Sequence, residues 1–363
     1  MRPRLVIDLS ALADNYKILA KLVQPAQCAA LVKARAYGLD AKMIAPAFYK
    51  AGCRSFFVHD WEEAQEIITL LPRKEIELYI LSGLGGKPPE YFQGLIPVLN
   101  HSSELAHFSE YCQMHGPQKA ALHIDTGLSR LGLSQAEWED IKRNPQILAG
   151  IDWQAFISHL ACSDEKAHPL NKIQLEAFKK ALIWWREHIS NHTLSSLSAS
   201  GGIFLGSDYH FDFVRPGAAL YGLKTSLHAS PLKPVIRIEA PILQIRRIDA
   251  GASVGYGATH SFAHPGKIAT LGIGYADGIS RAFGNKGWVI IHGKRAPIIG
   301  RISMDLTIID ITHIEDECRM GDFVTLVGME QSCDDWALQG GTIGYEILTS
   351  LGPRFERHYI GQV

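Results

Sequence analysis

The sequence predicts an α/β fold in which an N-terminal (β/α)8 barrel, residues 1–230, is followed by a C-terminal mostly-β domain, residues 231–363. Three observations lead to this prediction. A chain of 363 residues is long enough for two domains. In its first two thirds, short apolar runs alternate with amphipathic stretches, which indicates parallel strands joined by helices. After Pro231, strand-like runs follow one another with glycine-rich turns between them.

The barrel prediction depends on the number of strand–helix units. The first strand, at residues 5–8, leads into a helix that starts at Ser10, and the second strand, at 29–33, precedes a helix over 43–50. Further strands are expected at 55–59, 78–82, 95–99, 121–125, 153–160, 193–200 and 213–223, with helical segments between them that include a long one over 171–189. A doubly wound sheet has the same alternation and stays open as an alternative topology.

The C-terminal domain is expected to contain one helix among many strands. Strands are expected at 235–248, 267–276, 287–293, 298–305, 306–312 and 323–328, followed by a helix at 342–351 and a last strand at 354–360. The sequence contains no repeats or long linker, so the two domains are expected to pack closely.

Composition excludes several classes of protein. The chain has 36 Lys and Arg against 37 Asp and Glu, which argues against binding nucleic acid or an anionic membrane. Its six cysteines form no C-x-x-C pair and are typical of reduced, buried thiols. No apolar run has the length of a membrane span, and the first residues lack the pattern of a signal peptide. We therefore expect a soluble, cytoplasmic protein.

Barrel enzymes carry their chemistry at the C-terminal ends of the strands. Lys33 ends an apolar strand, and a lysine that is desolvated there has a lowered pKa suited to Schiff-base formation. The alternative is a lysine that caps a strand and extends into solvent. Two late strands end at Ser200-Gly201-Gly202 and at Gly217-Ala218, whose backbone N–H groups are suited to phosphate. A strand-end lysine with a phosphate cradle is what pyridoxal phosphate needs.

Eight blocks in the same order resemble the alanine racemase family. The segment VKARAYG at 32–38 resembles the family's VKANAYGHG, whose lysine carries pyridoxal phosphate. The other similar blocks are HIDTGLSRLG at 123–132, SHLACSD at 158–164, SLSASGG at 196–202, FVRPGAALYGL at 213–223, GIGYADGISR at 272–281, GRISMD at 300–305 and TIGYEI at 342–347. The resemblance covers nearly the whole chain and implies the interconversion of L- and D-alanine, with D-alanine supplied for peptidoglycan.

The resemblance also implies a role for each matching residue. Lys33 would hold pyridoxal phosphate and act as one acid/base, and Tyr275 would act on the opposite face of the substrate's α carbon. His159 would hydrogen-bond Tyr275. Arg215 would face the pyridine nitrogen and, because a guanidinium keeps its proton, would leave that nitrogen unprotonated. An acidic residue stands there in related barrel decarboxylases.

Phosphate binding by resemblance falls to Tyr37, Ser200, the N–H groups of Gly217 and Ala218, and Tyr345. Arg130 and the N–H of Met304 would bind the substrate carboxylate, and Asp305 is a weaker supporting candidate. His123 stands where the family often has a carbamylated lysine, and it is expected to support Arg130 without a full negative charge.

Other functions remain open on the sequence. They are a broader-specificity amino-acid racemase, a barrel-type pyridoxal-phosphate decarboxylase, and a non-catalytic protein that carries the cofactor. His188 and His192 could share a helical face, but no third ligand lies near them, so no metal is expected. By resemblance the working unit is a homodimer in which the β domain of one chain brings Tyr275 and Met304 to the site of the other.

Overall fold

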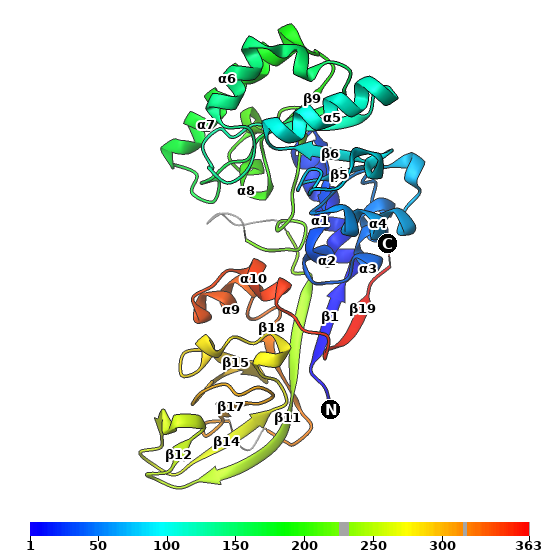
Figure 1. Cartoon of the computed structure of the whole chain (residues 1–363). Helices are drawn as coiled ribbons and strands as arrows, with labels where there is room; N and C mark the ends of the chain where they lie inside the picture. The colour runs from blue at the N-terminus through cyan, green and yellow to red at the C-terminus, as the bar shows by residue number, and fades with distance from the viewer. Residues whose placement is uncertain (225–231, 315–317, 363) are drawn as a thin grey trace. The chain divides into compact units, whose positions relative to one another are not determined.

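The computed structural model describes residues 1–224, 232–314 and 318–362. The chain divides into two compact units. The barrel unit comprises Leu12–Ala36 and Asp40–Leu232, and the β unit comprises Met1–Ala11, Tyr37–Leu39 and Lys233–Gln362. Figure 1 shows how the chain passes through the elements of both units.

The centre of the barrel unit is a curled sheet of seven parallel strands in the order β3-β4-β5-β6-β7-β8-β9. The strands are β3 (Ala30–Leu31), β4 (Ser55–Val58), β5 (Glu77–Ile80), β6 (Ile96–Leu99), β7 (Lys119–His123), β8 (Asp152–Ile157) and β9 (Leu194–Ser196). The helices are α1 (Leu9–Leu22), α2 (Lys33–Tyr37), α3 (Ala41–Lys50), α4 (Trp61–Leu70), α5 (Ser102–His115), α6 (Gln135–Arg143), α7 (Pro169–His188) and α8 (Ser200–Ile203), of which α1 and α2 extend into the β unit.

Short pairings close this sheet on itself. Strand β10 (Phe213–Val214) runs parallel to β2 (Gln27–Cys28), and the N–H of Leu31 donates to the carbonyl of Pro216 at 3.0 Å. On the other side of β10, Arg215, the residue after this strand, forms a parallel bridge with Ala199 just beyond β9. Because β10 thus links the last strand of the sheet to the first, the predicted barrel is confirmed.

Aromatic side chains fill part of the barrel core. The rings of Phe57 and Tyr79, from neighbouring strands, stack with centroids 4.4 Å apart, and Phe213 lies 6.1 Å from Phe57. The guanidinium carbon of Arg215 lies 6.0 Å from the ring of Phe57. These packed rings therefore support the strand ends at which Arg215 lies.

The β unit is built around one sheet with the path β16-β15-β18-β11-β1-β19, which β14 and β17 extend from β11. Its strands are β1 (Arg4–Asp8), β11 (Ile236–Ile248), β12 (Ser253–Val254), β13 (His260–Ser261), β14 (Gly266–Leu271), β15 (Trp288–Ile291), β16 (Lys294–Pro297), β17 (Thr307–Asp310), β18 (Phe323–Val327) and β19 (Glu356–Ile360). Its described residues also include the helices α9 (Cys333–Gly340) and α10 (Gly344–Thr349). The predicted mostly-β domain is confirmed.

Three sequence predictions about the elements are wrong. The strand expected at 5–8 does not belong to the barrel, because β1 pairs with β11 and β19, so the β unit also includes the first eleven residues. Residues 298–305 form no strand beyond a bridge from Ile298 to Ile309. The C-terminal domain has α9 in addition to the one helix expected.

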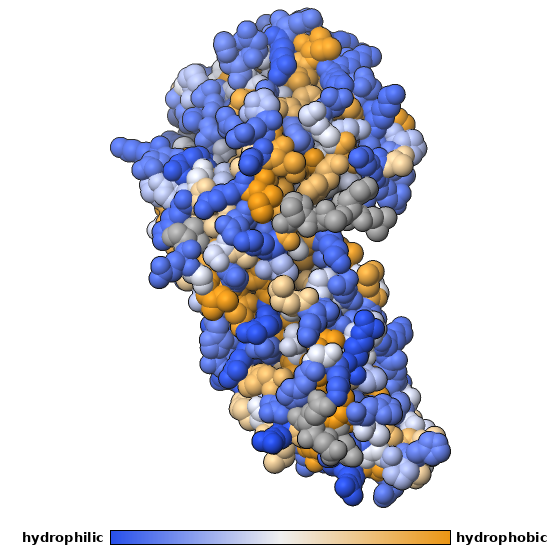
Figure 2. Space-filling model, turned by 180° about the vertical axis from the view of Figure 1, so that it is seen from behind, coloured by the Kyte–Doolittle hydropathy of each residue, from blue (hydrophilic) through white to orange (hydrophobic). Residues whose placement is uncertain are grey.

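The face in Figure 2 consists mostly of hydrophilic residues, with hydrophobic side chains in small groups between them. None of the helices in residues 1–224, 232–314 and 318–362 combines the length and apolar character that crossing a bilayer requires.

Candidate active site

Lys33 begins a left-handed turn directly after the barrel strand β3. The φ angles of the next four residues, Ala34 to Tyr37, lie between 53° and 55°. None of these residues is glycine, and a left-handed backbone costs a residue with a Cβ about 1–2 kcal/mol. Such a turn persists only where its surroundings hold it, and strained turns of this kind gather at functional sites. The sequence did not indicate this turn.

The carboxylate of Glu63 holds the start of the turn. Its Oε1 accepts the N–H of Ala34 at 2.6 Å, and its Oε2 accepts the N–H of His59 at 2.8 Å. Glu63 is itself oriented by Asp60, whose side chain accepts the N–H of Glu63 at 2.9 Å and caps α4. Sequence analysis missed Glu63, although an Asp followed three residues later by a Glu is the signature of a helix start.

Three cationic side chains lie near one another at the carboxyl ends of the barrel strands. Burial lowers the pKa of Lys33, and the charges of Arg130 and Arg215 lower it further, while Glu63 acts in the opposite direction. Burial and the charge of Arg130 lower the pKa of Arg215 to about 10. Such a concentration of positive charge favours an anionic ligand.

Arg215 is only 4% exposed and is fixed by hydrogen bonds. Its Nε donates to the hydroxyl of Ser196 at 3.0 Å, and its Nη2 donates to the carbonyl of Ser158. Arg130 is exposed and follows a turn that Asp125 builds by accepting the N–H groups of Gly127, Leu128 and Ser129. One arginine is therefore rigidly held and the other extends from a shaped loop.

The histidines predicted for the site are both neutral at pH 7. Burial lowers the pKa of His123 to about 3, and burial together with the charge of Arg215 lowers the pKa of His159 well below its usual value. The amide nitrogen of Asn100 donates to the carbonyls of Leu81 and Val98, so its oxygen faces Nδ1 of His123 at 2.8 Å. Nδ1 therefore carries the proton, and Nε2 of His123 is an acceptor.

Ser200 and the loop after β10 form a set of hydrogen-bond donors. The hydroxyl oxygen of Ser200 accepts the N–H of Gly217 at 2.9 Å and that of Ala219 at 3.1 Å. The hydroxyl proton of Ser200 therefore points elsewhere. Between these two amides, the buried N–H of Ala218 has no acceptor in the described part of the chain. A buried donor without a partner is costly, and an anion bound there would satisfy it.

The remaining predicted residues belong to the β unit. Tyr275 opens a 3-10 turn, Tyr275–Asp277, and its N–H donates to the carbonyl of Ser303 at 3.1 Å. The N–H of Ala276 donates to the carbonyl of Met304 at 3.0 Å. Tyr275 and Met304 are 42% and 53% exposed, and a pocket of about 310 Å³ lies beside Tyr275. Asp305 follows Met304 and accepts from Arg354 at 2.7 Å.

Tyr37 and Tyr345 lie together within the β unit, with ring centroids 6.3 Å apart. Tyr37 is buried, and burial raises the pKa of its phenol. The next residue is Gly38, where a Cβ would lie 2.4 Å from the carbonyl oxygen of Leu348, so only glycine fits. The predicted residues therefore form two groups, one in each unit.

No three His, Cys, Asp or Glu side chains are grouped to hold a metal ion among the residues that the structure describes. His188, considered above as a ligand, hydrogen-bonds the carbonyl of Trp184 at 2.8 Å and stacks on its ring.

The chain thus combines a barrel unit that carries a largely buried lysine at its strand ends with a β unit that carries an exposed tyrosine. Models of the alanine racemase N-terminal and C-terminal domains match residues 7–225 and 235–359. The chain belongs to the alanine racemase family.

Relatives and solved structures resemble the chain over nearly its whole length. It is 40% identical to the alanine racemase of Rhizobium meliloti, over 99% of this chain and 97% of the relative. It is 42% identical to a catabolic alanine racemase of Agrobacterium fabrum, over 98% of this chain and 92% of the relative. The structure of Bartonella henselae alanine racemase with covalently bound pyridoxal phosphate matches with a TM-score of 0.94 and 42% identity. The match covers 99% of this chain and 100% of that one. The structure of the biosynthetic alanine racemase of Pseudomonas aeruginosa matches with a TM-score of 0.89 and 31% sequence identity, over 99% of each chain.

Proposed function

We propose that this protein interconverts L- and D-alanine with pyridoxal phosphate bound to Lys33. The observation that carries the proposal is the cationic cluster of Lys33, Arg130 and Arg215 at the barrel strand ends, together with the unpaired N–H of Ala218. An anion with a phosphate group and an aldehyde fits this set, because the donors take the phosphate and the lysine takes the aldehyde. A relative at 42% identity carries this cofactor covalently.

The chain's own residues would divide the work of binding the cofactor. The hydroxyl of Ser200 and the N–H of Ala218 would donate to the phosphate, while Gly217 orients Ser200 through its N–H. By the resemblance, the phenols of Tyr37 and Tyr345 would also bind the phosphate. Arg215, held by Ser196 and Ser158, presents a donor that keeps its protons at neutral pH.

Substrate binding falls to Arg130 and to the N–H of Met304, which has no acceptor in the part of the chain that the structure describes. Together they would hold the alanine carboxylate. His123, neutral and with Nε2 as an acceptor, would orient Arg130, and Asp305 would position Met304.

Racemisation then needs two acid/base groups on opposite faces of the α carbon. When bound, pyridoxal phosphate weakens the bond between the α carbon and hydrogen of an attached amino acid. We assign one face to the amine of Lys33 and the other to the phenol of Tyr275, with His159 as the hydrogen-bond partner of Tyr275. Each group takes a proton in one direction and delivers one in the other.

The proposal includes a homodimer with shared sites. Tyr275, Met304, Leu306, Ile343 and Tyr345 give the β unit a set of exposed apolar side chains. A second copy of the chain would cover them by placing its barrel mouth over Tyr275 and Met304 in a two-fold arrangement. Closure by the partner would also exclude water from the reacting carbon.

We further propose that the protein acts in the cytoplasm and supplies D-alanine for peptidoglycan. A catabolic role is the second candidate, because two relatives, 42% and 41% identical, are named catabolic alanine racemases. A deletion strain distinguishes the roles: a requirement for D-alanine supports supply, and failure to grow on alanine as carbon source supports catabolism.

The enzymatic proposal is tested by measuring D-alanine formed from L-alanine by the purified, cofactor-loaded protein. We expect equal final amounts of both enantiomers and no product from Lys33→Ala. Serine and larger amino acids, assayed alongside, test the broader-specificity alternative. Release of carbon dioxide without racemisation would contradict the proposal and favour a decarboxylase.

A further inference from the structure

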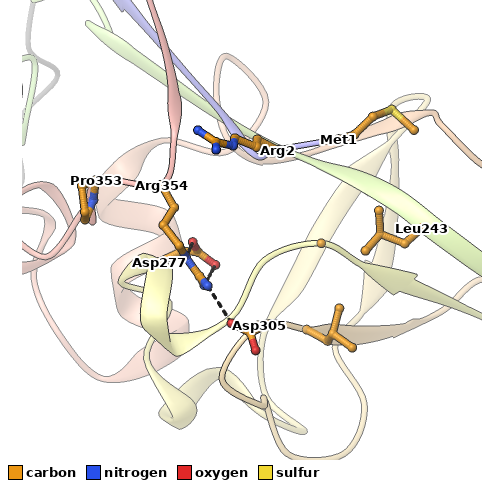
Figure 3. A pocket seen from close by; sticks show the side chains of 9 residues that line it. Met1, Arg2, Leu243, Asp277, Asp305, Pro353 and Arg354 are labelled. Atoms are coloured by element: carbon orange, nitrogen blue, oxygen red, sulfur yellow. Dashed lines mark hydrogen bonds and ion pairs between the residues drawn. The ribbon is translucent and has the colours of Figure 1, made fainter.

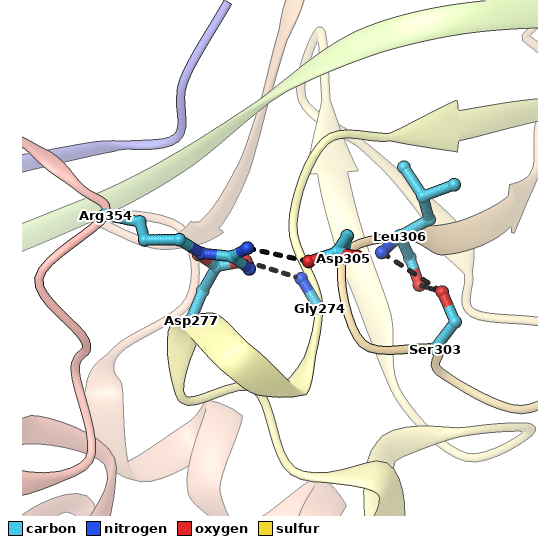
Figure 4. A network of polar contacts seen from close by, with 6 residues as sticks. All are labelled: Gly274, Asp277, Ser303, Asp305, Leu306 and Arg354. Carbon is cyan, nitrogen blue, oxygen red and sulfur yellow. Dashed lines mark hydrogen bonds and ion pairs between the residues drawn. The ribbon is translucent and has the colours of Figure 1, made fainter.

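The guanidinium of Arg354 joins two loops of the β unit that are far apart in sequence. Its Nε and Nη2 donate to the two carboxylate oxygens of Asp277 at 2.7 and 2.8 Å, and its Nη1 donates to Asp305 at 2.7 Å. Figure 4 shows the guanidinium between the two aspartates. A planar guanidinium can bind one carboxylate with two parallel bonds and still reach a second, which a lysine ammonium does not reproduce.

Asp277 transmits this linkage to the turn of Tyr275. It is only 2% exposed, and its Oδ2 also accepts the N–H of Gly274, which precedes Tyr275, at 2.9 Å. On the other side, the turn lies against the Met304 loop so closely that a Cβ on Gly274 would lie 2.4 Å from the carbonyl oxygen of Met304. Backbone contacts and the Arg354 bridge therefore fix the same two loops.

A third segment is attached through the main chain. The N–H of Gly352 donates to the carbonyl of Asp277 at 3.1 Å, and this segment follows α10, the helix that carries Tyr345. Arg354 thus connects the loops of Tyr275 and Met304 and is itself anchored beyond Tyr345.

The arginine does not serve to fill the core. Its side chain is 44% exposed and lines an open pocket of about 380 Å³, shown in Figure 3. An exposed ion pair contributes little stability, but Asp277 is buried and depends on its partners. The contacts of Arg354 are therefore directed at the two carboxylates.

We infer that Arg354 is a positioning residue that holds Tyr275 and Met304 in one mutual arrangement through Asp277 and Asp305. This inference rests on the proposed racemase function. In one direction the phenolate oxygen of Tyr275 would take the α proton, the electron pair of the broken bond would stay with the cofactor-bound amino acid, and Lys33 would deliver a proton to the opposite face. In the reverse direction Lys33 takes the proton and Tyr275 delivers one. Of the two proton transfers, loss of Arg354 slows the one that involves Tyr275.

Substrates with deuterium at the α carbon make this difference between the two directions measurable as a kinetic isotope effect. The enantiomers of alanine have equal free energies, so kcat/KM is the same in both directions for every variant. The isotope effect on kcat/KM, however, rises for the enantiomer whose proton Tyr275 removes, because that step limits the rate more. It falls for the other enantiomer, because reprotonation by Tyr275 becomes limiting after Lys33 has removed the deuteron.

The experiment compares Arg354→Gln, Arg354→Lys and Asp305→Asn with wild type and with Arg237→Gln. Arg237 is an exposed arginine on β11 that pairs with Glu239 at 3.4 Å. Since misplacement by about 1 Å costs about 100-fold in rate, we expect kcat/KM to fall about 10- to 100-fold in Arg354→Gln, with the two isotope effects moving in opposite senses. Asp305→Asn leaves the buried pair of Arg354 and Asp277 intact, so we expect it to fold and to show the same pattern with a smaller fall.

Two results would overturn the inference. One is kcat/KM within twofold of Arg237→Gln for both Arg354→Gln and Asp305→Asn. The other is a fall in kcat/KM with isotope effects that stay unchanged or move together, as a smaller fraction of folded enzyme would give. Absence of racemase activity in the wild type would instead contradict the proposed function.

Discussion

The carboxylate of Glu63 binds the backbone N–H of Ala34, the residue that directly follows Lys33. The same carboxylate binds the N–H of His59 at the end of β4, so it ties the left-handed turn to the neighbouring strand. Its negative charge also opposes the lowering of the Lys33 pKa by burial. Glu63 therefore affects both the position and the protonation of the lysine.

We predict that Glu63→Gln lets Lys33 capture pyridoxal phosphate at lower pH. Removing the negative charge disfavours the ammonium form, so the pKa of Lys33 falls and the free amine persists to lower pH. The measurement is the rate of cofactor capture by the cofactor-free protein as a function of pH. Glu62→Gln is the matched control, because Glu62 is the preceding residue on α4 and pairs with Lys87 at 2.8 Å. Identical pH profiles for the two variants would contradict the electrostatic role of Glu63.

Replacing Arg215 with Glu should lower racemase turnover and raise the formation of pyruvate by transamination. The guanidinium keeps its protons at neutral pH, whereas a carboxyl group can protonate the pyridine nitrogen and lengthen the lifetime of the carbanion. The measurements are D-alanine formation, pyruvate formation and a new long-wavelength absorption band. Arg215→Lys, which keeps a cation, is the control. Near-normal turnover without a new band in Arg215→Glu would be evidence against this assignment.

Acid should destabilise the protein partly through His123. Its pKa is about 3 in the folded chain and returns to its ordinary value of 6.5 on unfolding, so between these pH values the unfolded chain binds a proton that the native chain does not. The free energy of unfolding therefore falls with decreasing pH, by about 2 kcal/mol between pH 7 and pH 5. In His123→Asn, which keeps a donor for Asn100, this part of the loss should disappear from chemical denaturation curves.

The exposed His107 gives a control variant, His107→Asn, for the same denaturation experiment. An equal loss of stability between pH 7 and pH 5 in His123→Asn and wild type would mean that His123 is not the group responsible.

Mixed subunits test the shared site. When inactive Lys33→Ala and inactive Tyr275→Phe exchange subunits, each heterodimer has one site with both lesions and one with neither. Activity should recover to about a quarter of wild type if exchange is random and the sites act independently. Verified heterodimers without activity would show that each site comes from a single chain.

The periodicity of apolar residues and the positions of turn-forming residues predicted most of the fold, but not which strands pair with one another. The buried strand β1 reads like any barrel strand, and only its pairing with β11 and β19 assigns it to the β unit. Residues 298–305 are apolar enough for a strand, yet Tyr275 and Ala276 use the carbonyls of Ser303 and Met304, so the segment is a loop. Pairing between segments far apart in the sequence decides whether and where such a segment forms a strand, and a local sequence pattern carries no information about that pairing.

The resemblance predicted the residues assigned to the cofactor and the substrate. The residues that hold them in place were found only in the structure. Ala34, Arg35 and Ala36 carry no signal for a left-handed turn, because the conformation is imposed by contacts such as that of Glu63. Arg354 lies 77 residues from Asp277 and 49 from Asp305, so no motif joins them. Asn100, which fixes the protonated nitrogen of His123, is likewise 23 residues away.

The central claim is that Lys33 holds the cofactor and reacts at the substrate's α carbon, and reduction with borohydride tests it most directly. The purified, cofactor-loaded protein is reduced, digested and mapped by mass spectrometry. We predict that the pyridoxyl group is found on the peptide that contains Lys33, that the near-visible absorption band disappears, and that racemase activity is lost in proportion. A pyridoxyl group on another lysine, or an unchanged near-visible band in a Lys33→Ala variant that remains borohydride-sensitive, would contradict the claim.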